Sequence, residues 1–184
     1  MRITILSGSP RKESVTVRLA YFLQKELTSK GHIVNIADVR DYPLPQLQTT
    51  YLKEENTPDQ FRTLRLQMLS ADAFIIVTPE YNGAYTAELK SLVDHFAKEA
   101  FYHKAIGICT ASTGALGGIR AAVQLQQLSC ALFGVPVPHM LVVPQVDKKF
   151  DIAGNLLDEN FQKPIDVFTN EFLWLSTAVN STKA

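Results

Sequence analysis

Residues 2–14 read RITILSGSPRKES, a short apolar run followed by a loop of small, hydroxyl-bearing and basic residues. The run 2–7 predicts a strand. The residues after the loop repeat apolar side chains at helical spacing: Val15, Leu19, Phe22, Leu23 and Leu27. Unpaired N–H groups and the helix dipole favour an anion at such a helix start, and Ser9, Arg11 and Ser14 add donors suited to phosphate. An ordinary polar loop with a capping serine has the same composition, so the loop alone leaves both interpretations open.

The rest of the chain alternates between strand and helix patterns. Five apolar runs predict strands at 2–7, 32–37, 73–78, 104–110 and 136–143, and amphipathic patterns predict helices at about 14–30, 58–70, 86–99, 117–133 and 158–179. Near-continuous runs rich in Ile and Val are typical of strands buried on both faces. The alternation therefore predicts a doubly wound α/β fold, a five-stranded parallel sheet with helices on both faces. We expect residues 1–184 to form a single domain, because the length suits one full core.

Local signals refine this outline. Gly31 stands where the first helix should stop, and Thr57-Pro58-Asp59-Gln60 has the pattern of a capping box with proline at the first helical position. The last helix repeats apolar residues three and four apart, which predicts a face packed on the sheet: Phe161, Ile165, Phe168, Phe172 and Leu175.

Composition excludes several classes of function. Eighteen basic residues balance eighteen acidic ones, so neither a nucleic acid nor a membrane surface is an expected partner. No run approaches the length of a membrane span and no secretory signal is evident, so we expect a cytoplasmic protein. Cys109 and Cys130 are expected to be buried as small apolar residues. The four histidines are scattered without ligand spacing, and no metal site is expected.

Three loops that follow strands are the most distinctive stretches: 8–14, 79–86 and 111–117. In a parallel α/β sheet, ligands bind outside the carboxyl ends of the strands, near the point where strand order reverses. The second loop contains Tyr81, a flat aromatic surface, and polar groups that suit the edge of a heteroaromatic ring, although a plain turn with a surface tyrosine remains open. The third loop has small residues, which let a flat ligand approach the backbone.

Other occupants of this architecture lack their defining residues. The first loop has one glycine where a dinucleotide fingerprint needs three, and it lacks the Gly-Lys-Ser/Thr ending of a P-loop kinase. It also lacks the cysteine of a low-molecular-weight phosphatase, and Gly8-Ser9 stands where a receiver domain needs an acidic pair. The sequence therefore indicates a phosphate-bearing ligand with a flat ring, held without covalent chemistry from the protein.

Three separated stretches resemble the NADPH-dependent FMN reductase family of flavodoxin-like proteins: GSPRKESVTVRLA at 8–20, PEYNGAYTAELK at 79–90 and TASTGALGGIRAA at 110–122. The resemblance implies a flavodoxin-like fold, FMN as cofactor and NADPH as co-substrate. It implies that the FMN phosphate is held by Ser9, Arg11, Ser14, Thr16 and the backbone at Val15. It implies that the isoalloxazine is lined by Pro79, Glu80, Tyr81, Asn82 and Gly83, and flanked on its other edge by Ser112, Thr113, Gly114 and Gly117.

Two residues depart from the family pattern. Thr16 stands where the family usually has asparagine, and its hydroxyl could still reach the phosphate. Thr86 stands where the family favours proline, and threonine can cap the following helix.

The resemblance implies an oxidoreductase in which the flavin carries the hydride chemistry, so no catalytic side chain is expected. Small molecules are the expected electron acceptors: free flavin, quinones, azo dyes or metal oxyanions. The alternatives are a flavodoxin-type electron carrier without NADPH oxidase activity, and a flavin-binding regulatory protein. Carriers are usually strongly acidic, and the zero net charge points away from that role.

A homodimer or homotetramer is also implied by the resemblance. The apolar segment 86–103 adds a hint, since it carries more apolar residues than one sheet face needs: Leu89, Leu92, Val93, Phe96, Phe101 and Tyr102. An ordinary core helix with an aromatic turn explains the same residues.

Overall fold

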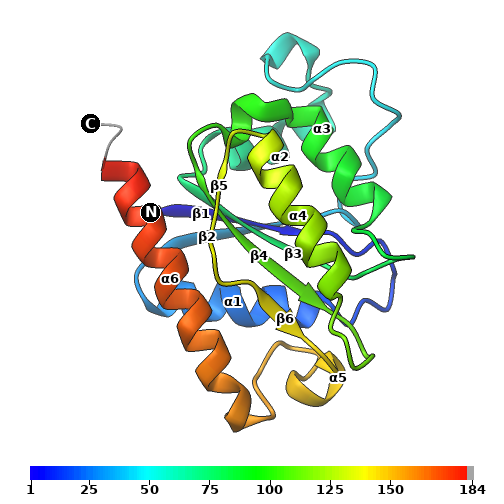
Figure 1. Ribbon diagram of the computed structural model, residues 1–184. Coiled ribbons are helices and arrows are strands. Elements are labelled where there is room, and N and C mark those ends of the chain that lie inside the picture. Colours follow the sequence, from blue (N-terminus) through cyan, green and yellow to red (C-terminus); the bar gives the residue numbers. More distant parts are fainter. Residues whose placement is uncertain (182–184) are drawn as a thin grey trace.

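The computed structural model describes residues 1–181, and the end of the predicted domain, 182–184, lies outside this range. Its strands lie in the order β2-β1-β3-β4-β5, with β6 also beside β4, and every pair is parallel (Figure 1). Their bounds are β1 Arg2–Ser7, β2 Ile33–Asp38, β3 Ala73–Thr78, β4 Ala105–Ala111, β5 Val135–Pro136 and β6 Leu141–Val143. This is the strand order of a flavodoxin-like sheet. The order in which strands are added reverses between β1 and β3, although all strands stay parallel. The predicted fold class is confirmed.

The fifth strand position differs from the prediction. A continuous strand was expected at 136–143, but two short strands, β5 and β6, lie beside the two ends of β4. Pro136 and Pro138 explain the break, because proline cannot donate to the ladder of hydrogen bonds.

Helices cover both faces of the sheet (Figure 1). On one face lie α1 (Val17–Ser29) and α6 (Gln162–Ser181), and on the other lie α2 (Arg62–Leu69), α3 (Ala87–Phe101) and α4 (Ile119–Ala131). Short turns complete the chain: α5 (Val146–Lys149) and the 3-10 helices η1 (Glu54–Asn56), η2 (Asp59–Phe61) and η3 (Glu159–Phe161). The apolar face predicted for the last helix is confirmed, since Ile165, Phe168 and Phe172 are fully buried. No helix in the described range is long and apolar enough to cross a membrane.

One helix boundary was predicted well and one was not. Gly31 follows α1 with φ +85°, and its N–H donates to the carbonyl of Thr28 at 2.9 Å, as expected at a helix end. The capping box at 57–60 is wrong, because the Thr57 hydroxyl donates back to the carbonyl of Lys53 at 2.8 Å. Thr57 closes the preceding turn η1, and the chain passes through η2 before α2 begins.

The cysteines and the 86–103 segment also test the sequence analysis. Cys109 is buried in β4, and burial raises the pKa of its thiol. Cys130 is exposed, contrary to expectation, because the inner face of α4 is formed by other residues of the helix. Of the six apolar residues named in that segment, only Tyr102 is exposed, at 48%, and the other five side chains belong to the core. That segment is an ordinary core helix with an aromatic turn.

Candidate functional site

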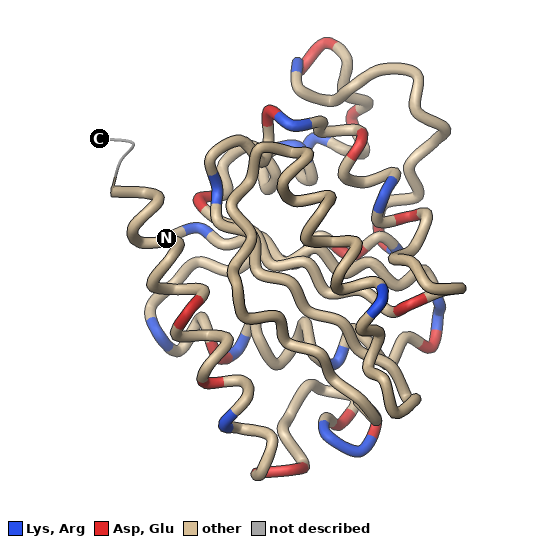
Figure 2. The backbone as a smooth tube through the Cα atoms, viewed as in Figure 1, with Lys and Arg blue, Asp and Glu red and all other residues tan. Residues whose placement is uncertain are grey.

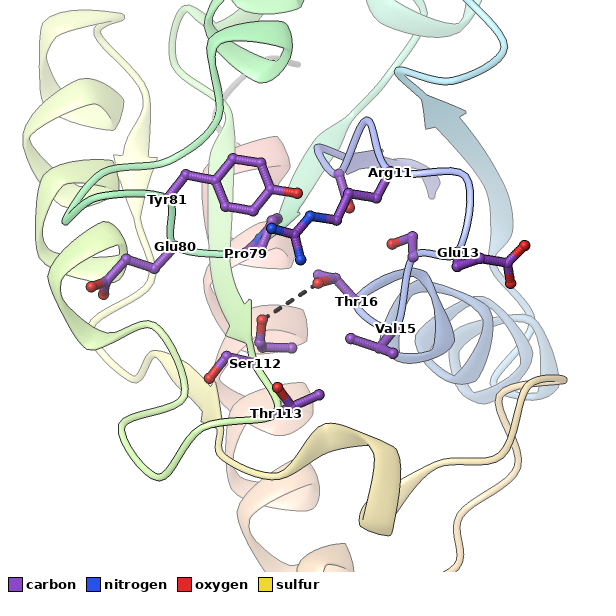
Figure 3. A pocket seen from close by; sticks show the side chains of 12 residues that line it. Arg11, Glu13, Val15, Thr16, Pro79, Glu80, Tyr81, Ser112 and Thr113 are labelled. Carbon is purple, nitrogen blue, oxygen red and sulfur yellow. Dashed lines mark hydrogen bonds between the residues drawn. The ribbon is translucent and has the colours of Figure 1, made fainter.

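The three distinctive loops meet around one cavity of about 270 Å³ at the carboxyl ends of β1, β3 and β4 (Figure 3). Most of the predicted site residues line it: Ser9, Arg11, Ser14, Val15, Thr16, Pro79, Glu80, Tyr81, Ser112 and Thr113. Asn82, Gly83, Gly114 and Gly117 do not line it. Sequence reasoning missed Glu13 and Ala111. The only indication in the sequence was their position, since Glu13 lies between Arg11 and Ser14 and Ala111 directly precedes Ser112.

Helix α1 presents its first turn to this cavity. The N–H of Val17 donates to Ser14 Oγ at 3.3 Å. The N–H groups of Val15 and Thr16 have no hydrogen-bond partner within residues 1–181. Ser9 is almost fully buried at 2% exposed. Two free amides and two serine hydroxyls therefore gather at the positive end of a helix dipole, the arrangement that binds a phosphate.

Thr16 connects two of the loops. Its hydroxyl donates to the carbonyl of Ala111 at 3.4 Å, drawn as the dashed line in Figure 3. A hydroxyl has one proton, so this side chain has none left for a phosphate oxygen. Any phosphate contact from Thr16 therefore comes from its backbone N–H, which differs from the hydroxyl contact that the resemblance implied.

Thr86, the other departure from the family pattern, also connects two loops. Its hydroxyl oxygen accepts the N–H of Leu89 at 3.2 Å, so the predicted cap of α3 is confirmed. The same hydroxyl donates to the carbonyl of Gly8 at the start of the first loop. A proline at this position could make neither hydrogen bond. Thr86 therefore fixes the first loop against α3.

A partly buried ion pair holds the first loop from its other side. The carboxylate of Asp38, at the end of β2, accepts the Ser7 hydroxyl at 3.0 Å and two guanidinium hydrogen bonds from Arg40 at 2.8 and 2.9 Å. These bonds raise the pKa of Arg40 above its ordinary value. Arg40 also donates to the carbonyl of Lys12 at 3.3 Å. The ends of β1 and β2 thereby hold the loop that carries Ser9 and Arg11.

Arg11 and Tyr81 face each other across the cavity (Figure 3). The Arg11 guanidinium carbon lies 4.8 Å from the centre of the Tyr81 ring, within the range of a cation–π contact. The Tyr81 hydroxyl oxygen is buried and has no hydrogen-bond partner in the described part of the chain. The Glu13 carboxylate points away from Arg11 in the same view, so the guanidinium charge stays available to an anion.

The second loop is a tight turn. Tyr81 and Ala84 exchange two backbone hydrogen bonds of 2.8 and 3.1 Å. Asn82 and Gly83 both adopt positive φ angles, 51° and 85°, which the Asn-Gly dipeptide favours. Glu80 was expected to offer an acceptor to a ligand, but its carboxylate is bonded to the start of α4. The turn therefore presents Tyr81 to the cavity, and the N–H groups of Asn82 and Gly83 are left unpaired beside it within the described range.

The third loop approaches β6 closely. Gly117 has a φ of +61°, and a Cβ there would lie 2.7 Å from Val142 Cγ1 and 2.8 Å from the backbone nitrogen of Pro144. The backbone therefore packs closely against its neighbours at Gly117. Ser112 is held by two backbone hydrogen bonds, from its N–H to Val143 and from Val146 to its carbonyl.

These residues fit FMN. Hydrogen-bond donors and one guanidinium gather at the α1 end of the cavity, where a phosphate dianion would be stabilised. Tyr81 adds an unpartnered buried hydroxyl, and Pro79 and Tyr81 supply flat apolar surface for a ring. The sequence profile of the NADPH-dependent FMN reductases matches residues 1–148. The chain belongs to this family. It is thus an FMN-dependent oxidoreductase that uses NADPH, as the sequence analysis predicted.

Similar proteins carry related names. The FMN-dependent NADPH-azoreductase of Staphylococcus saprophyticus is 28% identical over 180 residues, which cover 94% of each chain. The probable NADPH:quinone oxidoreductase 2 of Oryza sativa subsp. japonica is 27% identical over 172 residues, 90% of this chain and 83% of the rice protein. Among solved structures, the flavoenzyme NAD(P)H:(acceptor) oxidoreductase FerB of Paracoccus denitrificans superposes with a TM-score of 0.76 at 21% identity, covering 95% of this chain and 97% of its own. That likeness supports the fold.

Proposed function

We propose that the three-loop cavity holds FMN and that bound FMN passes electrons from NADPH to a small-molecule acceptor. The observation that carries this proposal is the meeting of free N–H groups, serine hydroxyls and Arg11 at the α1 end of a cavity whose other end is flanked by Tyr81. The bound flavin would supply the hydride chemistry. The chain's own residues bind it, orient it and shield one side of it.

Each loop has a separate part in this proposal. Ser9, Arg11, Ser14 and the N–H groups of Val15 and Thr16 bind the phosphate. The backbone from Pro79 to Gly83, with the Tyr81 ring, lines the isoalloxazine, and the segment from Ser112 to Gly117, which includes Thr113 and Gly114, flanks its other edge. None of these groups needs to act as a general acid or base.

The acceptor takes the place of nicotinamide after the flavin is reduced. One open cavity serves both half-reactions, so the acceptor is a small flat molecule such as a free flavin, a quinone or an azo dye, or a metal oxyanion. The azoreductase and quinone oxidoreductase names of the similar proteins support azo dyes and quinones among these acceptors.

Two measurements test this proposal. Titration of the purified protein with FMN should quench flavin fluorescence and saturate near one equivalent per chain, with weaker binding of FAD. Anaerobic NADPH should then bleach the flavin absorbance, and parallel lines in double-reciprocal plots would support two half-reactions at one site. Absence of saturable FMN binding at micromolar concentrations contradicts the proposal. Flavin that only a partner reductase can bleach would instead identify an electron carrier.

We further propose that the protein is a homodimer or homotetramer assembled through the outer face of α4. Leu116, Ile119 and Val123 are exposed by 61%, 37% and 46% beside the third loop. Arg120 is the only charged residue of α4, and the rest of this helix is drawn in tan in Figure 2. An apolar face with few charges is typical of a surface covered by another chain.

Val123→Glu should therefore shift the protein to a monomer, because a carboxylate cannot be buried in an apolar interface without a partner. Light scattering coupled to size-exclusion chromatography measures the mass. The matched control is Val167→Glu on α6, which is similarly exposed at 41% but lies on the other face of the sheet. A wild-type protein that is already monomeric at micromolar concentration contradicts this proposal.

Two further expectations belong to the proposed function. Both cysteines are free in the described chain, which supports a reducing compartment such as the cytoplasm. One continuous sheet receives helices from both ends of the chain, which supports a single domain.

A further inference from the structure

Both carboxylate oxygens of Glu80 accept hydrogen bonds from helix α4. One oxygen accepts the N–H groups of Arg120 and Ala121 at 3.0 and 3.4 Å, and the other accepts the Arg120 guanidinium at 3.1 Å. The Glu80 side chain is only 15% exposed, whereas that of Arg120 is 65% exposed. The carboxylate therefore lies against the first turn of α4, where N–H groups lack partners within the helix and the dipole favours a negative charge.

Helix α4 has no cap of its own. Gly118 occupies the N-cap position with a φ of 88° and offers no side-chain acceptor. A Cβ on Gly118 would lie 3.0 Å from Thr110 Cβ and 3.5 Å from Glu80 Cβ. The glycine thus leaves room for the second loop to approach, and Glu80 supplies the capping oxygen that a serine or aspartate normally supplies.

A second contact joins the same loop to the same helix. The Gln124 side-chain amide donates to the carbonyl of Gly83 at 3.0 Å. Glu80 directly precedes the turn that Tyr81 and Ala84 close, and Gly83 is one of its two central residues. The N–H groups of Asn82 and Gly83 have no hydrogen-bond partner within residues 1–181. Helix α4 therefore fixes a turn with these two unpaired amides, next to Glu80 and Tyr81, which line the cavity.

We propose that the Glu80 carboxylate positions the flavin ring indirectly, by holding the second loop through Arg120 and the first turn of α4, and that the carboxylate itself does not contact the flavin. This inference rests on the proposed function. The Glu80 contacts order the turn before the ligand arrives, which lowers the cost of binding. They also aim its N–H groups at the ring edge, where such donors stabilise the negative charge that a flavin gains on reduction.

A double-mutant cycle tests this inference. Glu80→Ala should weaken FMN binding about 3- to 10-fold, because the turn must then be ordered on binding. It should also make the midpoint potential of bound FMN more negative, because the N–H groups of the turn are no longer held at the ring edge. Arg120→Met should act in the same direction, by up to about 5-fold, because it removes one exposed ion pair. In the Glu80→Ala background, Arg120→Met should change nothing further, because its partner is gone. Glu80→Gln keeps an acceptor for the α4 N–H groups and should fall between wild type and Glu80→Ala.

The control is Arg62→Met, which removes an ion pair of similar length, 2.9 Å, between an arginine of similar exposure at the start of α2 and the exposed Asp59. It should leave both FMN affinity and potential unchanged. Thermal unfolding of each apoprotein checks that it folds. If Glu80→Ala does not fold, the double-mutant cycle is made with Glu80→Gln and Arg120→Met instead. If wild type binds FMN, two results overturn the inference. One is that Glu80→Ala and Arg120→Met have additive effects, and the other is that neither substitution changes the midpoint potential of bound FMN. A wild type that binds no FMN overturns the proposed function together with it.

Discussion

Arg11→Ala should weaken FMN binding by about 10- to 150-fold, which corresponds to a charge-assisted hydrogen bond of roughly 1.5–3 kcal/mol. Arg11 lines the same cavity as Val15 and Thr16, whose free N–H groups directly precede α1, and its guanidinium lies 4.8 Å from the Tyr81 ring centre. Its planar fork can give a phosphate paired hydrogen bonds on top of the helix dipole. Turnover per bound flavin should barely change once FMN is saturating, because the phosphate lies far from the reacting ring.

Two variants make this experiment specific. Arg11→Lys keeps the charge without the fork and should fall between wild type and Arg11→Ala. Lys12→Ala removes an equal charge from the neighbouring residue, whose side chain does not line the cavity. It should change affinity by no more than about 3-fold, since exposed charges contribute little. Fluorescence titration gives each dissociation constant. Equal affinities of Arg11→Ala and wild type would mean that Arg11 serves only to cover Tyr81.

The sequence predicted the sheet because its evidence is local. Continuous apolar runs fix where strands lie, and the alternation with helices fixes that they are parallel. Four of the five strand positions were predicted within one or two residues, and the fifth was broken by Pro136 and Pro138 within an otherwise apolar run. The capping box failed because its Thr57 closes the preceding turn instead.

The composition of the site was also predictable, but the partners of its side chains were not. Strand ends brought the three loops together, so most of the proposed residues line one cavity. Glu80, however, meets a residue forty positions later, and Thr16 meets one ninety-five positions later. No spacing in the sequence reports such contacts, since they depend on how loops pack after the sheet has formed. Both side chains had been expected to face the ligand. Thr16 instead connects the first loop to the third, and Glu80 connects the second loop to α4.

Gly117→Ala should destabilise the protein by about 2–4 kcal/mol, combining an overpacked contact with a left-handed backbone that a side chain disfavours. The added Cβ would meet Val142 Cγ1 at 2.7 Å and backbone atoms of Val143 and Pro144 at 2.9 and 2.8 Å. Backbone atoms cannot move aside as a flexible side chain can, so the third loop must shift away from β6. The melting temperature of the apoprotein should fall by roughly 4–16 °C.

Gly114→Ala is the matched control within the same loop. Its added Cβ would have Ser112 Oγ as nearest neighbour, at 3.6 Å, and Gly114 is not among the residues with positive φ. Its stability should stay within about 0.5 kcal/mol of wild type. Because Ser112 is bonded to Val143 and Val146, a shift of the loop at Gly117 should also move Ser112 and weaken FMN binding. Equal melting temperatures for the two variants would mean that the third loop adapts freely, and that its close approach to β6 does not shape the flavin cavity.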